Sequence, residues 1–451
     1  MIIEALNKYV FSLLSPVLLM GAGLFFTLYL GMFHIIHPIR TLKNMIKKSG
    51  SGAQSPFRAL CLALAGTLGV GNIVGVASAI SVGGAGAVFW MWVSAILAMM
   101  LKYAEILLAV RYRKCGTDGF FGGAVYYIKA AFESRKMKKI GCLTSAIFGA
   151  LCIANSLSMG CVMQVNALSS SILSVADISP LFIGIAVCAL CLLSVCGDRK
   201  RVGKISEIAV PVASIAYIVV GILAIYVGKD KIFYVFEKIF SDAWDFRSVG
   251  GGILGFLSSS ALRYGTMRGL ISNEAGCGTA PTAHASANTD SPYRQGLLGI
   301  VEVFVDTIVL CTLTALVIMI SGVNGQGIDP MDFCINAFEY LLGGWVRYFM
   351  AGAIFVFAFA TVICWAHYGR EALLYFTSKK WAVGAYMTVF CTSAIFGAVA
   401  SADIVWEIAD LAIGAMTLIN VSVLLMMRRE IKKETEFGIK KHKNFKKGLD
   451  N

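Results

Sequence analysis

The sequence predicts an all-α polytopic membrane protein, on the basis of its composition, its long apolar runs and the placement of its charges. Of 451 residues, 58% are hydrophobic and 14% are charged, whereas soluble domains carry about 25% charged residues. A water-soluble surface cannot be built from so few charges, so a soluble globular enzyme is excluded. Eight prolines are too few for a disordered chain, and 46 glycines with no period of three exclude collagen.

The apolar runs predict eleven membrane-spanning helices, each of which needs about 20 apolar residues. A leading helix at 9–33 is followed by ten more, numbered helix 1 to helix 10. The leading run is too long for the core of a signal peptide and lacks a convincing cleavage site, so we interpret it as a helix. The predicted ranges of helices 1 to 10 are 57–81, 83–110, 141–173, 180–197, 205–228, 248–271, 294–322, 345–370, 380–400 and 402–427.

The charges of the connecting segments alternate along the chain and predict its orientation. Every second connection is basic, and the intervening connections hold mainly carboxylates. We expect the protein to lie in the cell membrane. Because basic loops stay on the cytoplasmic side, we expect its N-terminus outside the cell and its C-terminal tail in the cytoplasm. The net charge of +13 then indicates contact with anionic lipid rather than with nucleic acid. Basic connections contain Arg40, Lys43, Lys47 and Lys48, then Arg199, Lys200 and Arg201, and then the tail from Arg428.

Helices 1 to 5 and helices 6 to 10 share features that predict an inverted repeat. Helix 1 has four glycines within 66–75, and helix 6 opens on the glycines 250–252. Amphipathic stretches precede helix 3, at 122–135, and helix 8, at 328–343. Because five is an odd number, the second half crosses the membrane in the opposite sense. Interrupted helices at corresponding positions of inverted halves are typical of secondary transporters, and close packing at glycine explains such a symmetric pair poorly.

This repeat divides the chain into five parts. The two repeats are the main domains, and the other parts precede, connect and follow them. The parts are the leading helix with its basic loop (1–54), the first repeat (55–228), an extracellular connection (229–247), the second repeat (248–427) and the basic tail (428–451).

Other classes of function fit the sequence less well. A channel needs a polar face repeated in several helices, and helices 2, 4 and 9 have none. An enzyme needs a catalytic cluster, but His284, which we expect in a cytoplasmic loop, is accompanied by no nucleophile and no metal-ligand spacing. Cys188-x-x-Cys191 has no second pair and lies in an apolar helix, so it predicts neither zinc nor redox chemistry.

The expected break in helix 1 predicts the chemistry of the cargo. Unwinding a helix in the membrane leaves backbone groups without partners, at a cost of several kcal/mol each. The N-terminus of a half-helix offers N–H groups to a carboxylate, and freed carbonyl groups coordinate a cation. An amino acid together with sodium supplies both. Gly69 and Gly71 would let a carboxylate approach the amides, and Asn72 adds an oxygen suited to a hard cation.

Asp306 is an ionisable residue deep in helix 7. Twelve residues of helical rise from Arg294 place it about 18 Å into the membrane. Such a carboxylate is either a cation ligand or a proton carrier, or it forms an ion pair with Arg263 or Arg268 of helix 6. Glu302, one turn shallower, is interpreted as a structural partner.

Further polar and aromatic residues have two interpretations each. Gln164 is an isolated amide in helix 3, which either bonds a neighbouring helix or donates to a substrate carboxylate. Trp365 in helix 8 is either core or pocket wall. Thr361, one turn earlier, either lends its hydroxyl to sodium or bonds its own helix. Phe256 and Ser259 in helix 6 are equally open.

Several longer motifs match a known pattern, in collinear order between about residues 55 and 427. They include Gly69-Val-Gly-Asn72-Ile-Val-Gly75, Gly83-Gly-Ala-Gly-Ala-Val-Phe89-Trp90, Lys102-Tyr-Ala-Glu105, Asn273-Glu274-Ala-Gly and Glu302-Val-Phe-Val-Asp306. They closely resemble the signature of the alanine or glycine:cation symporter family. The resemblance implies a LeuT-type fold of five plus five helices, sodium- or proton-coupled uptake, and a small amino acid as cargo. Some members take serine or glutamine.

The resemblance also implies a site at the break in helix 1. The substrate carboxylate would lie on the amides around Val70 and Gly71, Gln164 would contact the substrate, and Trp365 would limit its side chain. Sodium would lie between helix 1 and helix 8. The expected substrate-binding residues are Gly69, Val70, Gly71, Gly75, Gln164, Phe256, Ser259 and Trp365, and the expected cation-binding residues are Ala65, Leu68, Asn72, Asp306, Phe357 and Thr361.

The sequence departs from the family pattern at several positions. The family usually has Thr at Val70, Ser at Ala360 and Gly at Ala98, and its helix 10 motif is replaced by the segment Ile413-Gly-Ala-Met-Thr-Leu-Ile-Asn420. Without a hydroxyl at Ala360, one expected sodium ligand is absent. The choice between sodium and a proton is therefore open.

We expect a sodium-coupled symporter that carries alanine or glycine into the cytoplasm by alternating access. The alternatives are a proton-coupled symporter or one that prefers glutamine or serine, both of the same fold, and, in a different class, an ion channel. We expect no enzymatic activity and no cofactor, with Na⁺ or H⁺ as the coupling ion. The expected partners are the amino acid, Na⁺ and the lipid bilayer, and the oligomeric state is left open.

Overall fold

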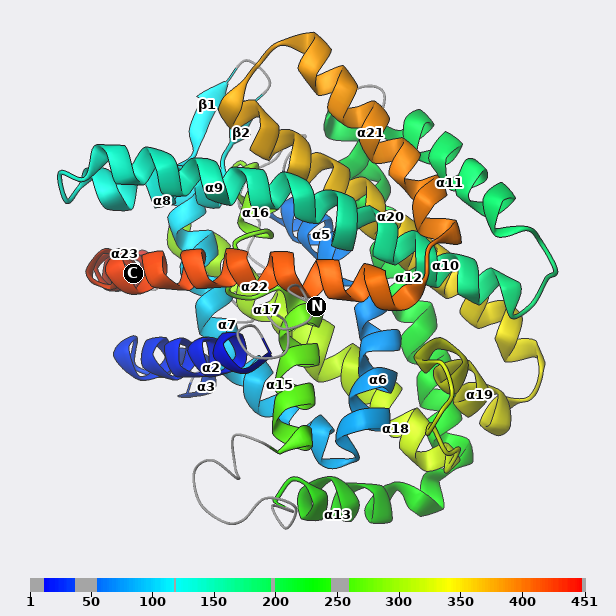
Figure 1. Ribbon diagram of the computed structural model, residues 1–451. Helices are drawn as coiled ribbons and strands as arrows, with labels where there is room; N and C mark the ends of the chain where they lie inside the picture. Colours follow the sequence, from blue (N-terminus) through cyan, green and yellow to red (C-terminus); the bar gives the residue numbers. More distant parts are fainter. Residues whose placement is uncertain (1–11, 37–54, 117–118, 196–198, 245–258, 448–451) are drawn as a thin grey trace.

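The structure is a computed structural model that describes residues 12–36, 55–116, 119–195, 199–244 and 259–447. Within these ranges the chain forms a bundle of helices with one short β-hairpin (Figure 1). Phe256 and the first part of predicted helix 6 lie outside the described residues.

The first repeat has a helix at each predicted position. Predicted helix 1 is divided into α5 (Pro56–Thr67), the 3-10 turn η2 (Val70–Asn72) and α6 (Val74–Gly83), with a bend of 62° between its halves. The leading segment forms α2 (Ser12–Tyr29) and α3 (Phe33–Ile36). The other elements are α7 (Gly86–Arg111), β1 (Lys114–Gly116), β2 (Gly119–Phe121), α8 (Ala124–Glu133), α9 (Lys138–Leu157), η3 (Ser158–Val162), α10 (Met163–Leu173), α11 (Pro180–Val195) and α12 (Arg199–Val227).

The second repeat follows a short connection that contains η4 (Lys229–Lys231) and α13 (Ile232–Asp242). Its described part begins with α15 (Ser260–Asn273), the second part of predicted helix 6. The remaining elements are α16 (Pro281–Ala285), α17 (Pro292–Val303), η5 (Phe304–Cys311), α18 (Thr312–Ser321), α19 (Pro330–Leu342), α20 (Trp345–Phe376), α21 (Lys380–Val399), α22 (Ala402–Met426) and α23 (Arg428–Lys447).

Seven helices in the described ranges are long and apolar enough to cross a membrane, and the bent pair α5–α6 is an eighth span. Two shorter apolar helices, Leu14–Tyr29 and Pro180–Val195, occupy the places of the leading helix and of helix 4. Large apolar side chains such as Leu193 and Ile208 face outward, with 66% and 69% of their surface exposed. Such faces belong in lipid, so the fold is that of a multi-pass membrane protein. The total of eleven spans stays a prediction, because helix 6 begins outside the described residues.

Among the described helices, three of the spans depart from α-helical geometry near their centres. The predicted break of helix 1 is confirmed: the extended backbone of Gly69, with φ −98° and ψ −154°, separates α5 from η2. Helix 3 contains a π-helical segment, Ser158–Val162, and helix 7 another, Phe304–Cys311. The sequence did not predict these segments. Because π-segments occur often at functional sites, they direct attention to Gln164 and Asp306.

Helices at corresponding positions of the two repeats pack against each other. The α6–α15, α7–α17 and α11–α21 pairs are in contact, and α9 and α10 both pack against α20 (Figure 1). This arrangement is expected around a pseudo-two-fold axis, where each helix of one repeat meets its counterpart. It brings the broken helix 1 beside α15 and α20 in the interior of the bundle.

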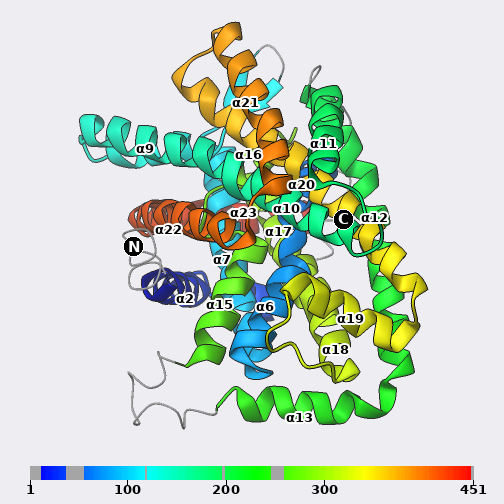
Figure 2. The ribbon, with the colours of Figure 1, turned by 45° about the vertical axis from the view of Figure 1, so that its right-hand side comes forward.

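The amphipathic stretches predicted before helices 3 and 8 are both helical. They form α8 and α19, and each packs its apolar side against the bundle, with Tyr127 and Phe338 among the fully buried residues. A further helix, α13, lies across the bundle and contacts α7 and α18 (Figure 2). These three helices cover the ends of the spans rather than crossing with them.

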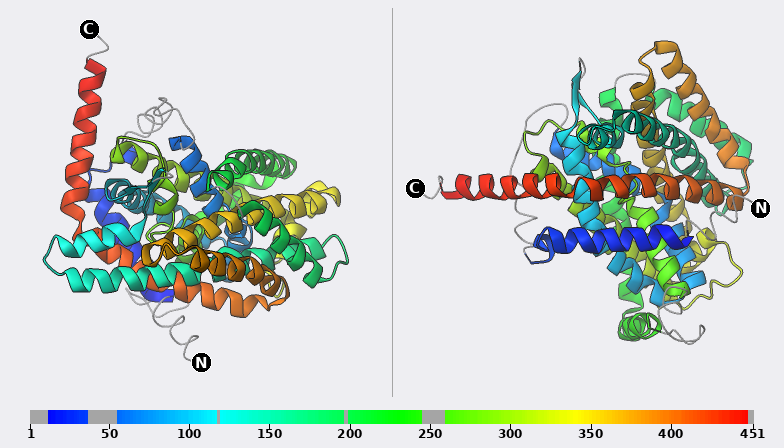
Figure 3. Two further views of the ribbon diagram at one scale, coloured as in Figure 1. Left: turned by 90° about the horizontal axis from the view of Figure 1, so that it is seen from above. Right: turned by 60° about the vertical axis from the view of Figure 1, so that its left-hand side comes forward.

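The basic tail forms a long helix, α23, that turns away from α22 and runs past the other helices (Figure 3). Its buried stripe consists of Ile431, Thr435 and Gly438, spaced by about one helical turn, and continues the buried Met427 at the end of α22. This stripe packs on α7 and α17: the hydroxyl groups of Thr435 and Tyr103 are 2.7 Å apart. The tail is therefore part of the folded bundle.

A hydrogen bond and an ion pair reinforce this contact. The Tyr112 hydroxyl donates to Glu430 at 2.7 Å, and burial beside that carboxylate raises the pKa of Tyr112. Arg111, at the end of α7, pairs with Glu434 at 3.2 Å. Both bonds join α23 to the end of α7.

Candidate functional site

The break in helix 1 leaves the N–H group of Val70 without a partner in its own helix, and a side chain of helix 3 accepts its hydrogen bond. The Val70 N–H donates to the amide oxygen of Gln164 at 3.1 Å. The other end of that side chain, Nε2, donates to the carbonyl oxygen of Met159 at 3.3 Å. Of the two interpretations of Gln164, the structure shows the bond to a neighbouring helix, made by its oxygen at the predicted carboxylate position. Donation to a substrate carboxylate stays a prediction.

The glycines of the break differ in the space around them. A Cβ atom on Gly69 would lie 2.6 Å from the Gln164 amide oxygen and 2.9 Å from the Thr361 hydroxyl, so only glycine permits both side chains to approach. A Cβ atom on Gly71 would be in ordinary contact with Ser272, at 3.6 Å, and one on Gly75 would meet nothing within 4 Å. Close approach is therefore required at Gly69, and open space remains beside Gly75.

Three oxygen atoms converge where α5 ends against α20. The Thr361 hydroxyl lies 2.8 Å from the carbonyl oxygen of Ala65 and 3.0 Å from that of Phe357. All three residues are almost completely buried. Leu68, the C-cap of α5, is 1% exposed, and Ala360 beside Thr361 contributes no polar group. Hydroxyl and carbonyl oxygens are the ligands that hard cations prefer, so this group of atoms can hold sodium.

Trp365 is fully buried and packs between helix 1 and helix 3. Its indole N–H donates to the carbonyl oxygen of Gly66 at 3.3 Å, which satisfies one of the carbonyl groups at the end of α5. A Cβ atom on Gly160 would lie only 2.4 Å from the Trp365 Cβ, so the π-segment of helix 3 must carry glycine there. The indole is held on two sides next to the break.

Asp306 and Asn72 are hydrogen-bonded to each other at the π-segment of helix 7. The Asn72 amide nitrogen donates to Asp306 Oδ1 at 2.8 Å. The hydroxyl groups of Ser272 and Thr307 donate to Oδ2 at 2.9 and 2.8 Å. The donors to the Asp306 side chain are thus amide and hydroxyl groups, so the alternative of an ion pair with Arg263 or Arg268 is not the one that the structure shows. The side-chain amide oxygen of Asn72, Oδ1, is buried with no hydrogen-bond partner in the described part of the chain.

The expected site residues therefore form two groups. Gln164, Thr361 and Trp365 surround the end of α5, and Asn72 and Asp306 lie on the other side of the break, towards α15. Ser259 is buried at the start of α15 but makes none of these hydrogen bonds. Phe256 lies outside the described residues, which leaves its role untested.

A network of buried ionisable groups extends from Asp306 and was not predicted as a unit. Lys102 donates to the carbonyl oxygen of Asn273 at 2.7 Å and pairs with Glu302 at 3.2 Å. His284 Nε2 lies 3.0 Å from Glu302, and its Nδ1 lies 2.8 Å from the Gln295 amide nitrogen. Glu302 is a structural partner as expected, although its partners are Lys102 and His284. The signal in the sequence was the presence of ionisable residues inside apolar runs.

His284 lies in the connection between predicted helices 6 and 7, as expected, and this connection contains the short helix α16 that Pro281 starts. The imidazole is fully buried there, with Glu302 and Gln295 as its polar partners. Among the residues that the structure describes, no three His, Cys, Asp or Glu side chains converge as a metal centre.

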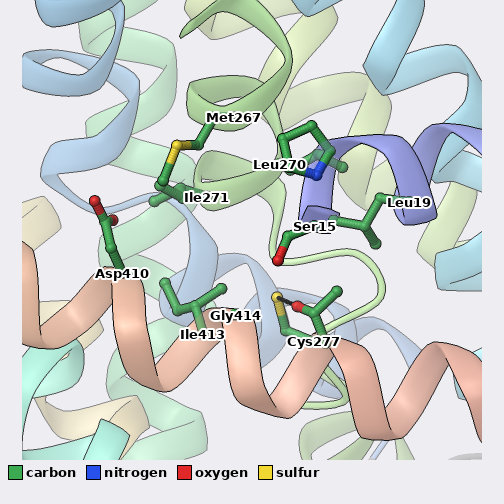
Figure 4. Close-up of a pocket in the computed structure, with 11 residues that line it drawn as sticks. Ser15, Leu19, Met267, Leu270, Ile271, Cys277, Asp410, Ile413 and Gly414 are labelled. Carbon is green, nitrogen blue, oxygen red and sulfur yellow. Dashed lines mark hydrogen bonds between the residues drawn. The ribbon is translucent and has the colours of Figure 1, made fainter. Parts of the chain in front are cut away.

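A small cavity lies between the leading helix α2 and the helices α15 and α22 of the second repeat (Figure 4). Ser15 and Leu19 of α2 line it on one side and Met267 and Ile271 of α15 on another, and Asp410 of α22 lies at its edge beside Ile271. Its volume is about 30 Å³, room for one or two water molecules. Because an amino acid does not fit, this cavity is not the substrate site.

The repeat-related helix pairs, the broken helix 1 and the buried oxygen atoms beside it define a secondary transporter with inverted repeats. The sequence pattern of the sodium:alanine symporter family matches residues 1–449, and the chain belongs to that family. It is 35% identical to the sodium/alanine symporter AgcS of Methanococcus maripaludis over 446 residues, 96% of each chain. It is 32% identical to the probable sodium/glutamine symporter GlnT of Bacillus subtilis, over 95% of this chain and 88% of GlnT.

A solved structure also has the same fold. The crystal structure of MhsT in complex with L-phenylalanine aligns with a TM-score of 0.61 over 86% of this chain and 92% of MhsT. At 13% identity, this likeness concerns the fold alone. It supports the LeuT-type fold expected from the sequence.

Proposed function

We propose that the protein is a sodium-coupled symporter that carries a small neutral amino acid into the cytoplasm. The observation that supports it most is the convergence of the Thr361 hydroxyl with the carbonyl oxygens of Ala65 and Phe357, next to the Val70 N–H at the break. Cation ligands and a carboxylate-binding amide therefore lie in one buried place, as the joint transport of sodium and an amino acid requires.

In this proposal sodium lies among Ala65, Leu68, Phe357 and Thr361. The single hydrogen of the Thr361 hydroxyl is shared between two carbonyl oxygens at 2.8 and 3.0 Å. Sodium would turn that hydrogen outward and take all three oxygen atoms as ligands. Because Ala65 and Phe357 belong to different repeats, the ion would tie the repeats together.

The substrate carboxylate replaces the Gln164 amide oxygen on the Val70 N–H. Gln164 then turns its amide nitrogen towards the carboxylate and becomes a donor. Gly69, Gly71 and Gly75 leave room for the backbone of the amino acid. Trp365 closes the pocket and favours small side chains, alanine and glycine first. The alternatives are serine and glutamine, and the similarity to the probable sodium/glutamine symporter GlnT supports glutamine.

The second polar group, Asn72 with Asp306, is proposed to take a further cation. The side-chain amide oxygen of Asn72, Oδ1, has no hydrogen-bond partner in the described part of the chain. The carboxylate of Asp306 supplies the negative charge and lies 2.8 Å from the amide nitrogen of Asn72. Binding there would link helix 1 to helix 7. If transport depends on a proton gradient instead, Asp306 is the proposed carrier.

Alternating access follows from rocking of one repeat against the other around these sites. The charge distribution of the connections supports an N-terminus outside and a tail in the cytoplasm. Inward transport then runs towards the end of the bundle at which α8 and α23 lie.

The test is uptake of labelled alanine, glycine, serine and glutamine by liposomes that contain the purified full chain. We expect uptake to follow an imposed sodium gradient and Asp306→Asn to abolish it, because the amide supplies no negative charge to hold a cation among the neutral donor groups of Asn72, Ser272 and Thr307. Asp177→Asn, at an exposed connection, is the matched control and should be unaffected. If none of the four amino acids moves faster with the sodium gradient than without it, sodium coupling is wrong, and a proton gradient is the next condition.

A further inference from the structure

Glu105 is a fully buried carboxyl group at a junction of four segments. It lies near the end of α7 and contacts the loop that follows α15, where Gly276 and Gly278 have positive φ angles of 85° and 78°. Asn420 of α22 reaches the same point, and its amide oxygen accepts from the hydroxyl of Tyr127 in α8 at 2.5 Å. A change at Glu105 would therefore reach α7, α8, α22 and the loop after α15 at once.

The two oxygen atoms of this carboxyl group have different surroundings. Oε1 accepts from the backbone N–H of Gly278 at 2.9 Å and from the Asn420 amide nitrogen. Oε2 is buried and has no hydrogen-bond partner in the described part of the chain. A carboxylate spreads its charge over both oxygens, whereas a carboxylic acid accepts through one oxygen and carries its proton on the other. The observed asymmetry fits the acid.

The surrounding charges point the same way. Lys102, one turn away on α7, pairs with Glu302 and bonds to the carbonyl oxygen of Asn273. Within the described ranges, neither Glu105 nor Glu274 has a cationic group at ion-pair distance. Glu274 is instead held by the Thr279 hydroxyl at 2.5 Å. The ammonium group of Lys102 is thus the nearby positive charge for several buried carboxyl groups but, among the residues that the structure describes, pairs directly with Glu302 alone. A buried charge without a close partner is strongly disfavoured, which favours the uncharged form of Glu105.

The groups that face Glu105 come from every segment around it. They are Lys102 on its own helix, Tyr127 from α8 and Cys277 from the loop after α15, while α22 contributes the non-ionisable Asn420. Lys102 favours the ionised form, but Glu302 is closer to it. The uncharged tyrosine and thiol offer no positive charge.

We propose that Glu105 is a proton-binding site, with a proton on Oε2 while this junction is closed. When the junction opens, the O–H bond breaks, the electron pair stays on Oε2 and the proton passes to water. The carboxylate then resists closure until a proton returns. Low pH in the compartment that this junction faces therefore holds it closed, and high pH favours opening. This inference does not rest on sodium coupling or on the choice of amino acid.

The direct test is infrared difference spectroscopy of the purified full chain between mildly acidic and neutral pH, with Glu105→Gln as the variant. Glutamine keeps the oxygen that accepts from Gly278 and Asn420 and has the shape of the protonated acid. At neutral pH the protonated-carboxyl band of the unaltered protein should be weaker in Glu105→Gln by the contribution of Glu105, while any contribution of the buried Glu274 remains. The matched control is Glu339→Gln, whose parent carboxylate pairs with Arg347 at 2.5 Å in a half-exposed position, and it should keep the band.

A second measurement uses the buried thiol of Cys277, which lies between Gly276 and Gly278 and contacts the Thr417 hydroxyl at 3.4 Å. With the other cysteines replaced, its labelling rate reports opening of the junction. If opening needs the ionised form, the ratio of this rate to that in Glu105→Gln should rise by up to about tenfold per pH unit. A constant ratio, or an infrared band that is undiminished in Glu105→Gln, contradicts the proposal. Misfolding of Glu105→Gln would also contradict the proposal, because it would show that the closed junction needs an ionised carboxylate at this position.

Discussion

The amide oxygen of Gln164 accepts a hydrogen bond from the backbone N–H of Val70 at 3.1 Å. A side chain of helix 3 thereby repairs the backbone of helix 1 at its break, as a substrate carboxylate would. The same amide group is the proposed donor once a substrate is bound. Gln164 therefore competes with the substrate in one state and supports it in the other.

We predict that Gln164→Ala weakens amino-acid binding by about 1–3 kcal/mol, the usual cost of leaving a charged group without its donor. This corresponds to a roughly five- to 150-fold rise in Kd. Gln164→Glu should weaken binding further, because its carboxylate repels that of the substrate. Equilibrium binding of labelled alanine measures both.

The control is Asn166→Ala on the same helix. The Asn166 amide bonds to the carbonyl oxygens of Gly397 and Ala400 in the helix 9 region, at 3.1 and 2.8 Å. Its removal should leave the Kd unchanged. An unchanged Kd in a folded Gln164→Ala protein would return Gln164 to a structural role.

Trp365→Ala should widen the range of accepted amino acids. The indole fills space next to Gly66 and Gly160, and its loss opens a cavity of aromatic size. Leucine and methionine should then compete with labelled alanine, and alanine itself should bind more weakly. Truncation of a buried tryptophan also costs about 3–5 kcal/mol of stability. The competition series from glycine to leucine is therefore measured on Trp365→Ala and on the control variant Trp381→Ala, in which the replaced side chain is exposed. A uniform loss across the series would contradict the role of Trp365 as a size filter.

Thr361→Ala should raise the sodium concentration needed for half-maximal uptake, because one of three converging oxygen atoms is lost. Thr361→Ser keeps the hydroxyl and should stay close to the unaltered protein. Ala360→Ser adds a hydroxyl beside the same place and should lower the sodium requirement. The sodium dependence of alanine uptake checks all three, and equal values for Thr361→Ala and Thr361→Ser would exclude the hydroxyl as a ligand.

Lys102→Met should destabilise the protein by about 3–5 kcal/mol, the usual effect of removing one partner of a buried ion pair. Glu302 would keep His284 but lose its cation. The double variant Lys102→Met with Glu302→Gln should recover part of the loss, because the uncompensated charge is removed as well. Thermal unfolding of the purified protein measures this coupling, and simple additivity of the two changes would show that the pair is energetically unimportant.

The elements of this fold follow from local patterns, whereas the site follows from contacts between distant segments. Glycine spacing around Gly69 predicted the break in helix 1, since the backbone conformation depends on neighbouring residues. The partner of Gln164 was not predictable, because residues 94 positions apart meet there. The network around Lys102 was missed for the same reason: Asn273 and Glu302 reach it from other helices, and only the packing of α7 against α15 and α17 brings them together.

The helix α23 reaches back across the whole chain: Thr435 meets Tyr103, 332 positions earlier, and a Cβ atom on Gly438 would lie 2.4 Å from the Tyr293 side chain. During synthesis, α7 and α17 leave the ribosome long before α23 does. The ends of α7 and α17 therefore stay incompletely packed until α23 has been synthesised. A chain that is cut before α23 would thus carry its packing defect in helices 2 and 7, far from the cut.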